Sequence, residues 1–141
     1  MNVSEVMTAQ VVTATPRTAI AEVARTMAKI ESGAVPVVDD GRVVGLVTDR
    51  DIVIRVVAEG LGVDTPVADV MTANVETCRE DDNVADATAK MGSKQIRRLV
   101  VLNDQGKLAG IISLGDIAID YGAKKVGETL EEISENTPAA H

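Results

Sequence analysis

Short β-branched runs and amphipathic stretches alternate along the chain in a regular order. The runs VPVV at residues 35–38 and VVGLV at 43–47 flank DDGR, a typical turn sequence, and together they predict a β-hairpin. Before it, apolar residues at helical spacing predict a helix that starts after a Thr18 N-cap. These residues are Ile20, Val23, Met27 and Ile30. A strand, Val11-Val12-Thr13, is predicted before this helix, and a second helix over about residues 49–58 after the hairpin.

The same order of elements occurs a second time, because the chain repeats itself. VSEVMT at residues 3–8 recurs as VADVMT at 67–72, an offset of 64 residues. After one inserted residue near Gln105 the offset becomes 65, and it then pairs Asp51 with Asp116. The second copy predicts a strand at 75–77, a helix with Asp82 or Asn83 as its N-cap, a hairpin of 99–102 and 108–112, and a helix over about 114–121.

This repeat predicts an α/β (α+β) fold of two pseudo-symmetric β-α-β-β-α units that pack together. Near-continuous apolar strands imply a small sheet covered by helices. A unit of about 60 residues buries too little surface to stand alone, so we expect the two to pack across a pseudo-two-fold axis. We place the first unit at residues 1–62 and the second at 63–122, joined by a connector at 60–66 that contains two glycines and a proline. An acidic C-terminal helix and a frayed tail take residues 123–141.

The predicted C-terminal helix has a single apolar stripe on an acidic background. Its apolar residues are Val126, Leu130 and Ile133, and its acidic residues are Glu128, Glu131, Glu132 and Glu135. A one-sided stripe of this kind usually covers the core of the helix's own domain. We therefore expect the helix to pack on its own unit, and a dimer contact is the alternative.

Composition limits the chemistry that the fold can support. The chain is 45% apolar but has one tyrosine and neither phenylalanine nor tryptophan, so a bound ring would have to lie among aliphatic side chains. A net charge of −8 argues against nucleic-acid partners. One cysteine, Cys78, and one histidine, His141, cannot make a Cys/His zinc site or a histidine-based triad. The sequence shows neither a membrane-spanning stretch nor a secretory signal, so we expect a cytoplasmic protein without a membrane partner.

Each hairpin ends on the same motif, G-h-h-[ST]-x-x-D, in which h is an apolar residue. The copies contain Gly45, Thr48 and Asp51, and Gly110, Ser113 and Asp116. A hydroxyl followed three residues later by a carboxylate resembles a helix capping box, which explains one copy without any ligand. The glycine allows another group to approach the backbone, and the hydroxyl and carboxylate suit anions and ribose hydroxyls. Two copies at equivalent places therefore favour a ligand site, and capping is compatible with it.

From residue 3 to about residue 121, the chain resembles the CBS-domain family in its tandem-pair arrangement, often called a Bateman module. The resemblance lies in the leading V-x-x-V-M-T segment, the VPVVD segment that opens the hairpin, and the motif above. Among such proteins the chain looks like the short stand-alone kind. The resemblance implies that clefts between the two units hold an adenosine-containing ligand, such as AMP, ADP, ATP, NAD(H) or S-adenosylmethionine, with no required cofactor.

The resemblance also implies a role for each residue that matches the family pattern. Asp51 and Asp116 would accept hydrogen bonds from the ribose hydroxyls, and Thr48 and Ser113 would contact the ribose or phosphate. The adenine would be edged by the backbone at Ala34, Val35, Pro36, Leu99 and Val100, with Thr13 and Thr77 near the base. The phosphates would be reached by Arg97 and Arg98, with Arg50 as a weaker candidate. For these arginines, the alternative is an ordinary solvated surface charge.

The two units differ at these positions, which predicts unequal binding. Ser32-Gly33 stands in the first unit where the second has Ile96-Arg97, and Asp49-Arg50 stands where the second has Leu114-Gly115. Guanidinium groups suit phosphate recognition. We therefore expect the second unit's site to prefer a phosphorylated ligand, and the first to bind more weakly or to take a neutral adenosine moiety.

These observations favour a non-catalytic regulatory module that senses a ligand. The alternative is a scaffold or dimerisation module with vestigial clefts, and an enzyme ranks third because no metal cluster or nucleophile–base pair is present in the sequence. The resemblance also implies a homodimer, and the sequence names no downstream partner. Cys78, which matches Ala14, is interpreted as a small buried hydrophobe, because a lone thiol has no resolving partner for redox sensing.

Overall fold

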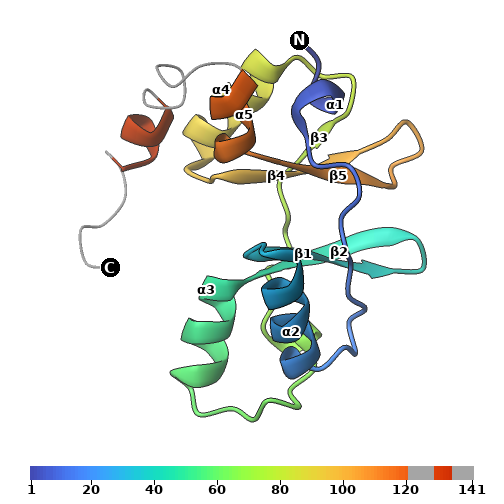
Figure 1. Ribbon diagram of the computed structural model, residues 1–141, viewed down its shortest axis with the longest axis vertical. Helices are drawn as coiled ribbons and strands as arrows, with labels where there is room; N and C mark the ends of the chain where they lie inside the picture. Colours follow the sequence, from blue (N-terminus) through green and yellow to red (C-terminus); the bar gives the residue numbers. More distant parts are fainter. Residues whose placement is uncertain (121–128, 135–141) are drawn as a thin grey trace. The chain divides into compact units, whose positions relative to one another are not determined.

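The computed structural model describes residues 1–120 and 129–134 as two compact units. The central unit is the continuous stretch Val11–Val75, and the terminal unit combines Met1–Gln10 with the described residues from Glu76 onward (Figure 1). The compact units therefore differ from the sequence repeats placed at 1–62 and 63–122. The leading segment of each repeat belongs to the compact unit that contains the hairpin of the other repeat.

The terminal unit has the predicted β-α-β-β-α order. Its three-stranded sheet has the order β3-β4-β5, in which β3 pairs with β4 in parallel and β4 with β5 antiparallel. The strands are β3 (Thr77–Arg79), β4 (Arg98–Leu102) and β5 (Leu108–Ser113). The helices are α1 (Val3–Val6), α4 (Val84–Lys94) and α5 (Leu114–Asp120), and all three lie on the same side of the sheet (Figure 1).

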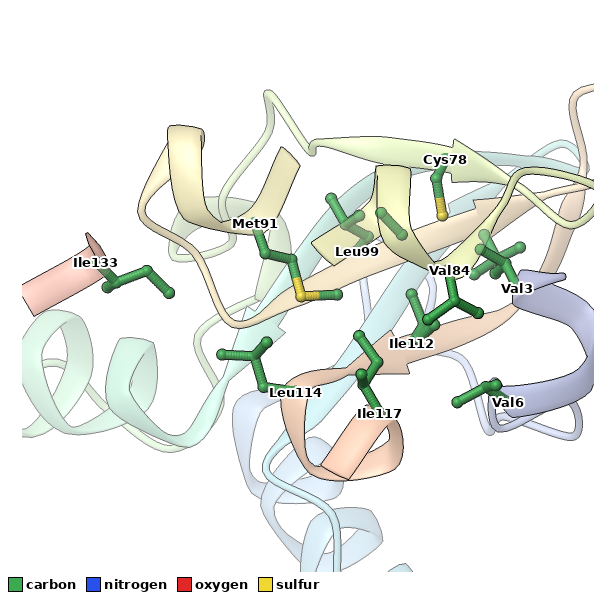
Figure 2. Packing of buried hydrophobic residues seen from close by; sticks show 12 residues of the cluster. Val3, Val6, Cys78, Val84, Met91, Leu99, Ile112, Leu114, Ile117 and Ile133 are labelled. Atoms are coloured by element: carbon green, nitrogen blue, oxygen red, sulfur yellow. The ribbon is translucent and has the colours of Figure 1, made fainter. Parts of the chain in front are cut away.

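Aliphatic side chains from both the sheet and the helices fill the core of the terminal unit (Figure 2). Met91 of α4, Leu99 of β4 and Ile117 of α5 are at most 1% exposed. Val3 and Val6 of α1 belong to the same cluster. The leading segment is thus part of this core, and burial of each such side chain contributes about 1.5–3 kcal/mol.

The central unit repeats this arrangement with a sheet of two strands instead of three. Its strands β1 (Ala34–Asp39) and β2 (Arg42–Thr48) form the predicted hairpin, and its helices are α2 (Ile20–Ile30) and α3 (Asp49–Ile52). The expected helix over 49–58 is present, but after α3 it continues as the π-helix η1 (Val53–Val57). The second repeat's leading segment forms the 3-10 helix η2 (Val67–Asp69), and Val67 and the following Val70 are buried in the core of this unit.

The predicted first strands are wrong in one repeat and shifted in the other. Val11-Val12-Thr13 is not a strand, and only Ala14 makes an isolated parallel bridge, to Val37. Pro36 explains the loss, because the next ladder bond toward the N-terminus would need its missing N–H. In the terminal unit the equivalent Val100 N–H donates to the Glu76 carbonyl at 3.3 Å. The strand predicted at 75–77 therefore forms there, displaced to Thr77–Arg79.

The N-cap of the first long helix also differs from the prediction. α2 begins at Ile20, and the Thr18 hydroxyl instead accepts a hydrogen bond from the Thr15 N–H at 3.0 Å. The first N–H groups of α2 find backbone partners, because Ile20 donates to the Thr65 carbonyl at 2.9 Å and Ala21 to a neighbouring carbonyl of the connector. A side-chain cap is therefore not needed.

The second long helix starts as predicted, with Asn83 as its N-cap. The Asn83 side chain accepts from the Ala85 N–H at 2.9 Å, which satisfies one of the free donors at the start of α4. Asp82, the other candidate, accepts from the Arg79 N–H at 2.9 Å and therefore stabilises the preceding turn.

The described part of the C-terminal segment, residues 129–134, is helical and packs on its own unit. Ile133 is 6% exposed and belongs to the terminal-unit core, and Leu130 packs against it. Glu132 lies so close to Gly92 of α4 that a Cβ at that glycine would contact its carboxylate. Val126, Glu128, Glu135 and the predicted tail lie outside the described residues.

The lengths and polarity of the helices bear on whether the chain could cross a membrane. Within the described ranges, every helix is too short or too polar to cross a lipid bilayer.

Candidate functional site

The two G-h-h-[ST]-x-x-D motifs form two matching capping boxes. In the central unit, the Thr48 N–H donates to Asp51 Oδ2 at 2.9 Å and the Asp51 N–H donates to the Thr48 hydroxyl at 3.2 Å. In the terminal unit, the Ser113 N–H donates to Asp116 Oδ2 at 3.0 Å and the Asp116 N–H donates to the Ser113 hydroxyl at 3.1 Å. The capping interpretation of the motif is therefore correct for both copies.

Each capping box still has hydrogen-bonding capacity for a ligand. The Thr48 and Ser113 hydroxyl oxygens accept from the backbone, which leaves each hydroxyl hydrogen free to donate. In each box, one carboxylate oxygen, Oδ2, accepts from the backbone, and the second, Oδ1, takes no part in the capping box. A donor and an acceptor therefore stand about one helical turn apart at each helix start, and an alcohol or a phosphate can use them.

The motif glycines make room for the leading segments of the repeats. A Cβ at Gly110 would lie 2.5 Å from the Thr8 carbonyl oxygen and 2.9 Å from Met7 Sδ. A Cβ at Gly45 would lie 3.0 Å from the Thr72 carbonyl oxygen and would also overlap the Met71 side chain. The group that approaches each glycine is thus the Met-Thr pair of a leading segment, which forms an antiparallel bridge beside it.

Each capping box lies directly beside the start of its hairpin. Ser113 pairs with Arg98 across the sheet, and the Leu114 N–H donates to the Arg97 carbonyl at 3.1 Å. Likewise Thr48 pairs with Ala34, and an equivalent bond joins the next residue to the Gly33 carbonyl at 2.9 Å. We name residues 33–36 with 48–51 the central junction, and residues 97–100 with 113–116 the terminal junction.

The two junctions carry opposite net charges. The central junction has two carboxylates, Asp49 and Asp51, against one guanidinium, Arg50, a net charge of −1. The terminal junction has two guanidiniums, Arg97 and Arg98, against the one carboxylate of Asp116, a net charge of +1. The electrostatic field at the terminal junction therefore favours anions more than the field at the central junction does.

The aliphatic residues of the junctions divide between the two faces of their sheets. Val35 and Leu99 pack into the cores of their own units and are 1% exposed. Side chains alternate along a strand, so Pro36 and Val100 lie on the opposite face from those cores. The side chains of Val35 and Leu99 are therefore used in core packing. Only their backbone is left to contact an adenine, as the resemblance implies.

The two threonines expected near a base have different surroundings. Thr77 lies in β3 opposite Val100, and its carbonyl accepts from the Lys90 ammonium. Thr13 is exposed and lies outside any strand. The structure thus brings Thr77 to the β4 residues of the terminal junction, whereas Thr13 occupies irregular backbone.

One charged residue beside the motif was not found by sequence reasoning. Arg55 Nε lies 3.8 Å from Asp51 Oδ1, four residues along the same helix. An acidic residue followed by arginine at i+4 is a recognised helix pairing, so the spacing was the available signal. Arg50, by contrast, is exposed.

Cys78 is a buried member of the terminal-unit core, at 7% exposure. Burial raises the pKa of its thiol from 9.0 to about 11, and the nearby Asp82 carboxylate acts in the same direction while Lys90 opposes it. At neutral pH the thiol is therefore protonated and a poor nucleophile. This agrees with its interpretation as a small buried hydrophobe.

The raised thiol pKa predicts a loss of stability at alkaline pH. Above pH 9 the unfolded thiol ionises while the folded thiol keeps its proton until about pH 11, so raising the pH across this window favours unfolding. We expect Cys78 to contribute a loss of roughly 2 kcal/mol. Urea unfolding at pH 8, 9.5 and 11 measures it, with Cys78→Ala as control because alanine occupies the matching position 14. Identical pH dependence in both proteins would contradict the prediction.

Comparison with known proteins decides the family. The CBS domain family matches the chain twice, over residues 3–58 and 67–120. The chain belongs to the CBS-domain family. These two CBS domains form a tandem pair, as the repeat predicted, and the α+β fold expected from the sequence is confirmed.

Relatives and solved structures cover nearly the whole CBS pair. It is 39% identical over 134 residues to the CBS domain-containing protein YhcV of Bacillus subtilis (strain 168), covering 94% of this chain and 95% of YhcV. It is similar to the CBS domain protein PAE2072 from Pyrobaculum aerophilum complexed with AMP, with a TM-score of 0.78, 29% identity, and coverage of 92% and 98%. The CBS domain pair of protein MJ0100, in complex with 5-methylthioadenosine and S-adenosyl-L-methionine, gives a TM-score of 0.78, 28% identity, and coverage of 86% and 100%.

Proposed function

We propose that this CBS pair is a non-catalytic regulatory module that binds an adenosine-containing ligand at its junctions. The observation that carries the proposal is the pair of capping boxes, each of which keeps a hydroxyl hydrogen and a second carboxylate oxygen available beside the start of a hairpin. The similar structures that contain AMP or S-adenosyl-L-methionine support the same ligand class. In this proposal Asp51 and Asp116 accept ribose hydroxyls, and Thr48 and Ser113 contact ribose or phosphate.

The remaining junction residues complete the proposed site. The backbone of β1 and β4 edges the adenine, at Ala34, Val35, Pro36, Leu99 and Val100. The ring lies among aliphatic groups, because the chain has no phenylalanine or tryptophan. Arg97 and Arg98 give the terminal junction its preference for a phosphorylated ligand, while Thr77 supports the base from β3. Thr13 and Arg50 are both exposed, and neither takes part in a capping box hydrogen bond.

A dye-based thermal-shift panel tests the proposed function. The panel contains AMP, ADP, ATP, NADH and S-adenosylmethionine, and a dye is needed because the chain has no tryptophan. A ligand present at about 100 times its Kd stabilises the folded state by roughly 2.7 kcal/mol, which raises Tm by several degrees. Absence of a shift with all five compounds would favour a scaffold with vestigial sites. Turnover of any of the nucleotides would instead indicate an enzyme.

We also propose that the pair assembles as a homodimer, which the family resemblance implies. Three aliphatic side chains of η1 are at least 50% exposed and offer apolar surface for such a contact: Val53, Ile54 and Val57. Light scattering coupled to size-exclusion chromatography measures the mass directly, and a mass of one chain at all concentrations would contradict this part of the proposal.

A further inference from the structure

The second carboxylate oxygens of the two capping boxes face different surroundings. Asp51 Oδ1 lies 3.8 Å from Arg55 Nε, and the Asp51 side chain is only 14% exposed. Arg55 Nη1 also donates to the Val70 carbonyl at 3.4 Å and reaches the Met71 carbonyl at 3.5 Å. Arg55 is thus held at the central junction by the leading segment behind it, and its guanidinium faces the oxygen that a ribose would use.

In the terminal unit, the position equivalent to Arg55 holds a carboxylate instead of an arginine. With the offset of 65 residues, Arg55 corresponds to Asp120, which is exposed on α5. Within residues 1–120 and 129–134, no cation pairs with Asp116. Among those residues, the terminal junction therefore has the same capping box as the central junction, but no cation of its own helix pairs with the motif aspartate.

We propose that Arg55 is a specificity-determining residue that makes the central junction a poorer acceptor of ribose hydroxyls than the terminal junction. This inference rests on the proposed function. A vicinal diol that donates to Asp51 Oδ1 must share this oxygen with a guanidinium or displace it, and displacement costs part of the ligand's binding free energy. The Arg55 side chain is 51% exposed, so solvent weakens the ion pair. The expected penalty is therefore small, roughly fivefold in affinity.

The test isolates one junction at a time by calorimetry with adenosine as the probe. Asp116→Asn disables the terminal junction, and in this background Arg55→Gln is expected to raise adenosine affinity about fivefold, whereas Arg55→Lys keeps the charge and should change it little. The reciprocal variant Asp120→Arg, made in an Asp51→Asn background, installs the arginine in the terminal unit. It should lower adenosine affinity by a similar factor, and within the described residues it removes no side-chain hydrogen bond or ion pair.

A second probe shows whether the effect acts through the ribose. With 2′,3′-dideoxyadenosine, which lacks both hydroxyls, Arg55→Gln should give no gain. An affinity that stays constant or falls on Arg55→Gln, or an equal gain with both probes, would overturn the inference while adenosine binding itself upheld the proposed function. Failure of the unmodified protein to bind adenosine, AMP or S-adenosylmethionine would overturn both. If Arg55→Gln unfolds the central unit, the Asp120→Arg arm decides alone.

Discussion

Gly110→Ala is expected to lower the free energy of unfolding by about 2–3 kcal/mol, because overpacking a tight site forces the backbone to shift. The new Cβ would lie 2.5 Å from the Thr8 carbonyl oxygen, a backbone atom held by its antiparallel bridge to Ile111. Gly45→Ala should cost less. Its nearest obstruction is the flexible Met71 side chain, and the Thr72 carbonyl oxygen is further away, at 3.0 Å.

Urea unfolding compares these variants with a matched glycine of the same motif. Gly115 lies inside α5, and a Cβ there would meet only the Ser113 hydroxyl oxygen, at 3.6 Å. Gly115→Ala should therefore be neutral or stabilise the protein by up to about 1 kcal/mol through helix propensity. If Gly110→Ala were as stable as Gly115→Ala, the leading segment would not be held against β5 as described.

Asp116→Asn is expected to weaken AMP binding about 10- to 100-fold, the range for loss of hydrogen bonds to a charged group. The asparagine side-chain oxygen can still accept from the Ser113 N–H, so the helix start keeps its cap. What is lost is the negative charge and the acceptor oxygen proposed to face the ribose, because the amide nitrogen in its place can only donate. Asp51→Asn should weaken binding less, because Arg55 already faces the corresponding oxygen.

Isothermal titration calorimetry with AMP measures both variants, and thermal unfolding without ligand controls for stability. Arg98→Gln provides a second comparison, because it removes one positive charge from the terminal junction and should weaken AMP more than adenosine. Equal losses for Asp116→Asn and Asp51→Asn would contradict unequal junctions. Unchanged AMP affinity in Asp116→Asn would remove this carboxylate from the site.

The repeat made most of the fold predictable from the sequence. Both hairpins, the Asn83 cap and the two capping boxes follow from local patterns of apolar, turn-forming and capping residues. The first strands were less predictable, because strand formation there depends on the partner strand. Val12 and Thr13 have strong β-propensity, but Pro36 lacks the N–H that would extend their ladder.

The charges of the junctions were also visible in the sequence, but their contacts were not. Arg97, Arg98 and the two motif aspartates could be identified from the repeat and the family resemblance. The partner of Asp51 is Arg55, and the reason that this arginine stays in place is a pair of carbonyls fifteen and sixteen residues away. Thr18 illustrates the same limit, because backbone carbonyls of the connector supply what its hydroxyl was expected to provide.

The exchange of leading segments also sets an order for folding on the ribosome. The central unit is one continuous stretch, Val11–Val75, so its core can close as soon as η2 has left the exit tunnel. Val3 and Val6 are synthesised before the central unit but must wait for α4, β5 and α5, because their packing partners follow that unit in the chain. The leading segment thus joins its core only after the central unit has been made, at the entropic cost of closing a loop as long as that unit.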